Sequence, residues 1–270
     1  MGLATFKGGV HPYDGKKLSE NQPIEVLMPK GELVYPMSQH IGAPAVPLVQ
    51  KGDPVLVGQK IGEAGGFISA NVICSVSGTV KGIEKRRTAG GDMVECVIVE
   101  NDGEYRTIAG MGEERDPSSL SSKEILEIIK EAGITGLGGA GFPTHVKLAP
   151  KEPDKIDFVI VNGAECEPYL TSDYRVMLEE GEKVVQGLKV ILQLFPKAQG
   201  VIGIEDNKPE AIRHMEKLVQ NESRIRVQPL KTKYPQGGER TLIYAVTGRK
   251  INSSMLPADA GCIVDNVDTV

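Results

Sequence analysis

The sequence predicts an α/β protein in two parts, a β domain over residues 1–105 and a domain with a parallel sheet over residues 106–270. Two observations support this prediction. The first hundred residues are rich in glycine and proline, and their short alternating apolar runs are typical of a small barrel or sandwich. After about residue 105, strand-like and helix-like runs follow one another in the order β-α-β-α-β. This order favours parallel strands joined by right-handed crossovers.

Three stretches of the first part have strand character. Apolar residues alternate between turn signals over residues 52–64 and 74–84, and residues 92–102 add a third apolar run. The pattern GDxVxxGQxIGEA followed by SGTV resembles the barrel-sandwich fold of biotinyl and lipoyl carrier domains. Those carriers present a lysine on a hairpin, but that position falls here near Phe67, and residues 61–80 contain no lysine. We therefore expect a docking or structural module and not a carrier.

The second part contains clear helix and strand signals. Ser121 and Glu124 form a capping-box pattern that begins a helix over residues 122–132, which Gly133 ends. Apolar spacing predicts one helix over residues 172–195, and Pro209 suits the start of another because its missing N–H group costs nothing there. Buried strands are predicted over residues 156–162, 200–206 and 225–231.

Composition indicates a soluble globular protein and excludes some partners. The chain is 40% hydrophobic and 25% charged, with a formal net charge of −5. The absence of a basic face argues against nucleic acid as a partner, and an aromatic content of 4% without tryptophan argues against a base-stacking surface. No apolar run approaches the roughly 20 residues of a membrane span, and no signal segment opens the chain, so we expect a cytoplasmic location without a direct membrane span.

The cysteines and the end of the chain carry two further expectations. Cys74, Cys96, Cys166 and Cys262 show no CxxC spacing, which argues against a metal site in this chain and against a disulfide framework. We expect them to behave mostly as small buried apolar residues. The apolar-rich ending IVDNVDTV suggests a chain truncated before a further segment.

A glycine-rich stretch, GITGLGGAGFPTHVKL, occupies residues 133–148. Gly136, Gly138 and Gly141 match G-x-G-x-x-G formally, but a predicted helix precedes them where the dinucleotide fingerprint requires a strand. Consecutive glycine N–H groups can form an anion-binding nest or lie flat against a planar ring. The Phe142-Pro143 pair directly after the glycines argues against a simple hinge. Lys147, a few residues later, offers a charge for a phosphate or a reduced ring. We therefore favour a ligand loop.

Two further loops are expected at the carboxyl edge of the sheet, where ligands gather in such folds. The stretch VNGAECEP follows the first strand and contains Asn162, Glu165 and Glu167. The stretch YPQGGERTL follows the third strand and places Glu239 in the first turn of a helix. Each has a plain alternative, because neighbouring acids can form a solvated turn and an acid suits a helix N-terminus by itself. The convergence of three loops favours a binding site.

Four motifs in order, GLGGAGFPTHVKL, NGAECEP, YPQGGERTL and IVDNVDTV, resemble the flavoprotein subunit of respiratory complex I and its relatives, which bind FMN and NADH. The opening FKGGVHPYDGKKLS and the stretch QHIGAPAVPLVQKGDPVLVGQKI resemble more specifically the RnfC family of the Rnf electron transport complexes. The resemblance covers essentially the whole chain. It implies a barrel-sandwich β domain followed by a Rossmann-like domain that binds FMN and NAD(H).

The resemblance also implies a role for each matching position in the glycine-rich stretch. Gly136, Gly138 and Gly139, with Gly141 beside them, would lie along the FMN. Lys147 would pair with the flavin, and Phe142 would help to form the nicotinamide pocket.

Further implied roles fall on the sheet edge. Asn162 and Glu165 match FMN-contacting positions, and Glu167 and Glu239 match positions that line the NADH site. Tyr234, Gly237 and Gly238 would continue the cofactor wall. Asn266 and Thr269 would hold the phosphate end of FMN.

Some positions depart from the complex I pattern. Arginine is typical where this chain has Leu137, aspartate where it has Ala164, and glutamate where it has Gly238. Leu148-Ala149-Pro150 replaces an aromatic residue. These departures affect the NADH contacts more than the FMN contacts. Two [4Fe–4S] clusters are expected only on a later cysteine-rich segment that this chain does not include.

The implied chemistry is hydride transfer between NADH and FMN, followed by single-electron transfer to iron–sulfur centres. The expected setting is the membrane-bound Rnf ferredoxin:NAD⁺ oxidoreductase, coupled to ion translocation. Its partners would be the other Rnf subunits, especially the iron–sulfur subunit that relays electrons to ferredoxin, on the cytoplasmic face of the bacterial inner membrane. No protein acid or base is needed, so His145 is not expected to transfer a proton. Two alternatives are a soluble cobalamin reductase of the microcompartment type, although its domain order is reversed, and a docking subunit without cofactor.

Overall fold

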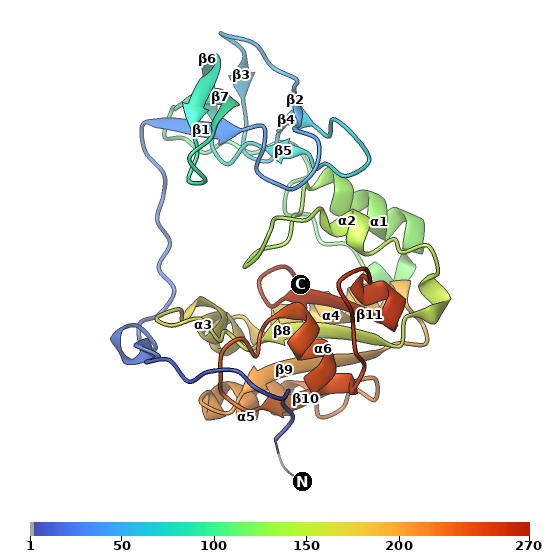
Figure 1. Cartoon of the computed structure of the whole chain (residues 1–270). Helices are drawn as coiled ribbons and strands as arrows, with labels where there is room; N and C mark the ends of the chain where they lie inside the picture. Colours follow the sequence, from blue (N-terminus) through green and yellow to red (C-terminus); the bar gives the residue numbers. More distant parts are fainter. Residues whose placement is uncertain (1–2) are drawn as a thin grey trace. The chain divides into compact units, whose positions relative to one another are not determined.

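The computed structural model describes residues 3–270, and its contacts divide the chain into two compact units (Figure 1). The α/β unit comprises residues 3–25 and Pro150–Val270, and the sandwich unit comprises Val26–Ala149. The domain boundary expected between residues 105 and 106 stays a prediction. The contacts within the structure divide the chain differently. They assign residues 3–25 to the α/β unit and residues 106–149 to the sandwich unit.

Two antiparallel sheets form the sandwich unit. The first has the order β1 (Glu32–Pro36), β7 (Met93–Asn101), β6 (Gly78–Arg87) and β3 (Pro54–Val55), and the second has the order β2 (Val46–Pro47), β4 (Lys60–Glu63) and β5 (Val72–Ile73). Val55, Ile61, Val80 and Val97 are buried together in their core. The expected sandwich is confirmed. Phe67 lies in the connection between β4 and β5 and is 84% exposed.

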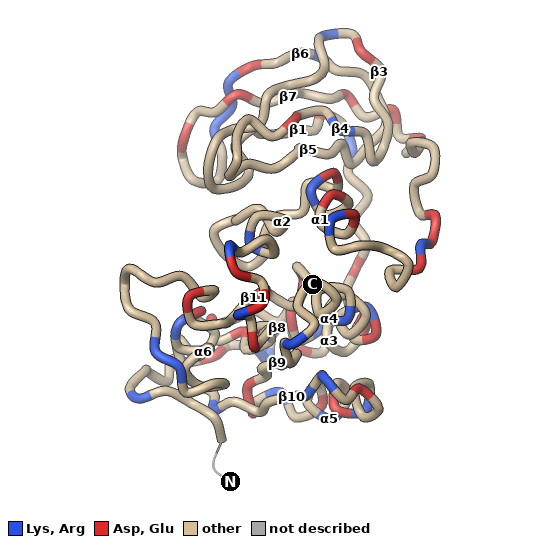
Figure 2. The backbone as a smooth tube through the Cα atoms, turned by 90° about the vertical axis from the view of Figure 1, so that its right-hand side faces the viewer, with Lys and Arg blue, Asp and Glu red and all other residues tan. Residues whose placement is uncertain are grey.

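Two α-helices follow the strands of the sandwich unit. In α1 (Ser122–Glu131), the Ser121 hydroxyl accepts a hydrogen bond from the Glu124 N–H and the Glu124 carboxylate accepts one from the Ser121 N–H, so the expected capping box is confirmed. Gly133 comes shortly after the helix. Glycine is needed there because a Cβ would lie 2.4 Å from the Asn71 carbonyl oxygen. The short helix α2 (Thr144–Lys147) comes after the glycine-rich loop. Figure 2 shows basic and acidic positions interspersed along α1.

A four-stranded parallel sheet is the centre of the α/β unit. Its order is β10 (Ile225–Leu230), β9 (Gln199–Glu205), β8 (Phe158–Gly163) and β11 (Cys262–Asn266). Along the chain, β8, β9 and β10 alternate with helices, which confirms the predicted β-α-β-α-β order. The strand β11 was not predicted, and it places Asn266 beside Asn162 at the end of the sheet.

Four α-helices accompany this sheet (Figure 1). They are α3 (Ser172–Glu179), α4 (Gly181–Leu194), α5 (Pro209–Val219) and α6 (Glu239–Thr247). Ile160 of β8 packs with Leu242 and Ile243 of α6. The single helix predicted over residues 172–195 is wrong, because the chain breaks at Glu180 and α4 starts at Gly181. A Cβ on Gly181 would lie 2.9 Å from Leu218 Cδ1, so the break lets this chain segment approach its neighbour closely.

Within residues 3–270, no helix combines the length and the apolar character that a membrane crossing needs. The four cysteines are all buried, as the sequence predicts, and each is a free thiol in the structure. Burial raises the pKa of both Cys166 and Cys262 to about 11, so these thiols stay protonated at neutral pH.

Candidate functional site

In the sandwich unit, the glycine-rich stretch forms a loop that is closed at its base. Thr135 and Pro143 form an isolated antiparallel bridge, and the Gly136 N–H donates to the Phe142 carbonyl oxygen at 2.8 Å. Thr144, the first residue of α2, donates its N–H to Ile134 O at 3.0 Å. Lys147 lies at the end of α2 and is half-buried. The predicted residues Gly136, Gly138, Gly139, Gly141, Phe142 and Lys147 thus share one loop and the turn of helix that follows it.

The glycines of this loop have different steric surroundings. At Gly141, where φ is +65°, a Cβ would lie 3.0 Å from Gln39 O, so packing within the chain explains this glycine. A Cβ at Gly139 would meet no atom of the chain within 4 Å, and at Gly136 the nearest atom would be 3.6 Å away. The chain itself therefore does not require a bare backbone at Gly136 and Gly139. Such an open stretch of backbone leaves room for a ligand to approach it closely.

His145 lies within α2 and is half-buried. Burial lowers its pKa, and the charge of Lys130 lowers it further, which favours the neutral imidazole.

In the α/β unit, Asn162 connects two of the predicted loops. Its Nδ2 donates to Gly237 O at 2.8 Å, and its Oδ1 accepts from the Ala164 N–H at 3.2 Å. The Gly237 N–H donates to Cys166 Sγ at 3.2 Å, so a second contact joins the same two loops. A Cβ on Gly237 would lie 3.3 Å from that sulfur, which leaves little room for a larger residue. The amide side chain of Asn162 therefore fixes both loops at the carboxyl end of β8.

The end of β11 adds a third loop to the same edge. Asn266 Nδ2 donates to Asp173 Oδ2 at 2.8 Å, and Asn266 O accepts from the Thr269 N–H at 3.0 Å. Gly238 precedes α6 and Glu239 begins it. The structure thus brings together the second group of predicted residues in loops and helix starts at one edge of the sheet. They are Asn162, Glu165, Glu167, Tyr234, Gly237, Gly238, Glu239, Asn266 and Thr269.

Glu165 is a buried carboxylate at this edge and is 5% exposed. Its Oε1 accepts from the Asp173 N–H at 2.8 Å, whereas its Oε2 has no hydrogen-bond partner. The nearest cations to Oε2 are Lys16 Nζ at 3.7 Å and Lys208 Nζ at 3.9 Å. Burial raises the pKa of Glu165 to about 7, and the two lysines offset only part of that effect. Glu165 therefore exchanges a proton near neutral pH.

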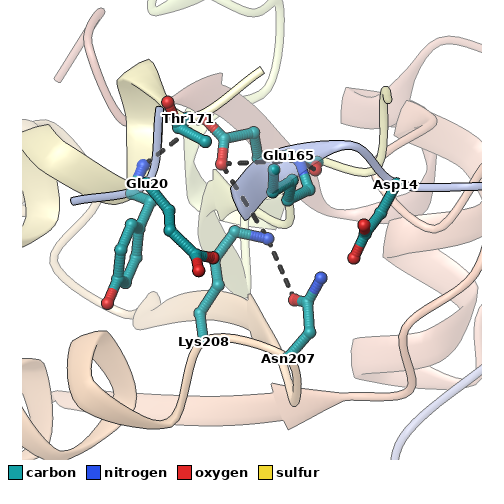
Figure 3. A pocket seen from close by; sticks show the side chains of 8 residues that line it. Asp14, Glu20, Glu165, Thr171, Asn207 and Lys208 are labelled. Atoms are coloured by element: carbon teal, nitrogen blue, oxygen red, sulfur yellow. Dashed lines mark hydrogen bonds and ion pairs between the residues drawn. The ribbon is translucent and has the colours of Figure 1, made fainter. Parts of the chain in front are cut away.

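A small pocket lies beside this carboxylate (Figure 3). Its lining comprises Asp14, Lys16, Glu20, Glu165, Thr171, Tyr174, Asn207 and Lys208. Lys208 Nζ donates to Ala164 O at 2.7 Å and to Asn207 Oδ1 at 3.1 Å, and it lies 3.7 Å from Glu205 Oε2. Burial lowers the pKa of Lys208. The pocket is lined by opposite charges, which suits a polar group better than an apolar one.

Sequence reasoning missed several charged residues of this edge. Glu205 is the last residue of β9 and Lys208 lies shortly after it, so the rule that identified Glu165 could have found them. Asp173 lies in the first turn of α3, and burial raises its pKa to about 6. Lys16 gave no signal, because it lies in a segment that was assigned to the β domain.

Two family models match the chain. Residues 4–104 match the RnfC barrel sandwich hybrid domain, and residues 129–270 match the Nuo51 FMN-binding domain. With the fold, these matches define a chain that joins a barrel-sandwich domain to an FMN-binding domain.

Curated relatives identify the family more closely. The C subunit of a proton-translocating ferredoxin:NAD(+) oxidoreductase complex from Clostridium ljungdahlii is 48% identical over 99% of this chain. Its Na(+)-translocating counterpart from Acetobacterium woodii is 47% identical over 98% of it, and the C subunit of an ion-translocating oxidoreductase complex from Pseudomonas aeruginosa is 39% identical over 99%. The chain belongs to the RnfC family. It spans 58%, 60% and 35% of the lengths of these relatives.

Proposed function

We propose that this chain binds FMN and exchanges hydride between the flavin and NAD(H) as part of a ferredoxin:NAD⁺ oxidoreductase. The names of the relatives and the match of residues 129–270 to an FMN-binding domain support the proposal. The observation that carries it is the bare backbone at Gly136 and Gly139, which the packing of the chain does not require. Bound FMN would supply the hydride and single-electron chemistry, while the protein supplies contacts and electrostatics.

The glycine-rich loop contributes close approach and charge to this proposal. Gly136, Gly138 and Gly139 allow a planar ring to reach the backbone. Lys147 places an ammonium at the end of the same loop, where it would favour an anionic flavin. Phe142 provides an apolar surface for the nicotinamide side.

The sheet edge contributes polar groups. Asn162 holds its two loops in place, and Asn266 and Thr269 provide amide and hydroxyl groups for the phosphate end of FMN. Glu167 and Glu239 are exposed and are assigned to the dinucleotide. Because the pKa of Glu165 is about 7, its carboxyl group holds a proton for much of the time at neutral pH. This proton limits the negative charge near an anionic cofactor.

The wider assignment concerns the whole complex. We assign the chain to the cytoplasmic face of the bacterial inner membrane as a peripheral subunit. Its electrons would pass to two [4Fe–4S] clusters on a later segment and to the iron–sulfur subunit that serves ferredoxin. Coupling to ion movement would depend on the other subunits. The names of the relatives support one part of this assignment, the place of the chain in an ion-translocating oxidoreductase complex with other subunits.

Replacing Lys147 by alanine is expected to weaken FMN binding by about 10- to 150-fold, because a charged hydrogen-bonding partner contributes about 1.5–3 kcal/mol. The measurement is a titration that follows the quenching of flavin fluorescence. The matched control is Lys151→Ala, which removes the same charge at an exposed position nearby and should bind FMN as the wild type does.

A wild-type protein that leaves flavin fluorescence unquenched would overturn the proposed function. Equal affinity in the Lys147→Ala variant and the wild type would remove only the role of this lysine.

A further inference from the structure

The N-terminal segment, residues 3–25, packs along the sheet edge of the α/β unit. Val10 and Tyr234 exchange two backbone hydrogen bonds, each of 2.8 Å. Lys233 is 7% exposed, and its Nζ donates to Gly8 O at 2.9 Å and to Phe6 O. Residues 6–10 therefore lie directly on the loop that contains Tyr234.

Lys16 makes the second attachment of this segment, and it is 6% exposed. Its Nζ donates to three backbone carbonyl oxygens of one loop, Glu165 O at 2.9 Å, Glu167 O at 3.0 Å and Leu170 O at 2.6 Å. These three bonds use every proton of the ammonium group. Lys16 is therefore saturated by the loop and has no proton left for a phosphate or another ligand.

The loop that Lys16 holds has an unusual backbone. Glu165 has φ +49° and Tyr169 has φ +67°, both in the left-handed region that residues other than glycine rarely adopt. Such a residue is strained and persists only where surrounding contacts fix it. Lys16 binds the carbonyl oxygen of Glu165 itself and that of Leu170, the residue after Tyr169, so its hydrogen bonds reach both strained positions. The Tyr169 N–H donates to Asp14 O at 2.6 Å, so a second contact from the N-terminal segment fixes the same loop.

We propose that Lys16 is a positioning residue that holds the 165–170 loop in the conformation needed for cofactor binding. This inference rests on the proposed function, because Glu165 and Glu167 are the residues of that loop assigned to FMN and NAD(H). The N-terminal segment thus forms part of the framework of the cofactor site, although it is distant in sequence from the motifs. Lys16 acts through the backbone of the loop and not by contact with the cofactor.

The test compares Lys16→Met with Lys17→Met. Methionine keeps the unbranched chain of Lys16 but removes its charge and its three donors, whereas Lys17 is exposed and serves as the matched control. We expect FMN to bind Lys16→Met about tenfold more weakly and Lys17→Met as it binds the wild type. In the cofactor-free protein, amide hydrogen exchange should become faster in residues 165–171 of Lys16→Met and stay unchanged in β9.

Rescue separates positioning from general destabilisation. Lys16→Arg keeps a positive charge and several donors, so its FMN affinity should return to within about threefold of the wild type. Unchanged affinity in Lys16→Met, or exchange that rises equally throughout the α/β unit, would overturn the inference. A wild type that binds no FMN would instead overturn the proposed function and the cofactor part of the inference together.

A second pair of variants decides the question if Lys16→Met does not fold. A Cβ on Gly15 would lie 2.3 Å from the Tyr169 ring, so Gly15→Ala separates the N-terminal segment from the loop. Gly31 has a similar φ, +71° against +63°, but nothing lies within 4 Å of its Cβ position. Gly31→Ala therefore has the conformational strain of a positive φ without the steric clash that Gly15→Ala adds. Weaker FMN binding in Gly15→Ala only would support the inference, and equal binding in both variants would contradict it.

Discussion

A protein with Gly139→Val is expected to unfold at the same temperature as the wild type and to bind FMN about a hundredfold more weakly. Gly139 is exposed, its φ lies outside the left-handed region, and no atom of the chain lies within 4 Å of its Cβ position. The apo fold therefore accepts a side chain there. A ring in van der Waals contact with the backbone, at about 3.5–4.0 Å, leaves no space for the valine methyl groups.

The control for this prediction is Gly141→Ala. Gly141 has φ +65°, and its Cβ would lie 3.0 Å from Gln39 O, so we expect this variant to lower the unfolding temperature without FMN. Calorimetry and fluorescence titration of both variants separate the glycine required by packing from the glycine assigned to the ligand. Wild-type FMN affinity in Gly139→Val would rule out contact between the flavin and the backbone at this residue.

The sequence predicted those parts of the fold whose signals are local. The strands β8, β9 and β10 were found because each is an apolar run bounded by turns. The strand β11 was missed because its identity depends on pairing with β8, which lies about a hundred residues earlier. The break at Glu180 was missed for a similar reason. The apolar spacing continues through it, and the close approach of Gly181 to Leu218 comes from tertiary packing.

The residues of the candidate site also divide into those that the sequence indicates and those that depend on tertiary contacts. Asn162 and Gly237 could be predicted because residues after parallel strands meet at one edge, and the structure adds the hydrogen bond between them. Lys16 could not be predicted, because its role depends on contacts with a loop 149 or more residues away. The glycine-rich loop is intermediate. The sequence indicated a bare backbone, but only the surroundings distinguish Gly141 from Gly139.

Replacing Glu165 by glutamine is expected to remove a large part of the pH dependence of stability. The folded protein raises the pKa of this carboxyl group from 4.5 to about 7, so it binds the proton more tightly than the unfolded chain does. The wild type should therefore lose stability as the pH rises from about 4.5 through 7. For these two pKa values, the loss between pH 5 and pH 8 is about 2.5 kcal/mol. Urea unfolding at both pH values measures it.

The physical cause is the burial of a charge that its neighbours stabilise incompletely. Lys208 and Lys16 lower the pKa of Glu165, whereas Asp173 raises it, and burial outweighs the two lysines. Glutamine keeps the acceptor for the Asp173 N–H but does not titrate, so the stability difference between pH 5 and pH 8 should shrink by about 2.5 kcal/mol. Glu167→Gln removes the same charge at an exposed position and should leave that difference unchanged. Equal pH dependence in Glu165→Gln and the wild type would show that Glu165 is ionised throughout this range.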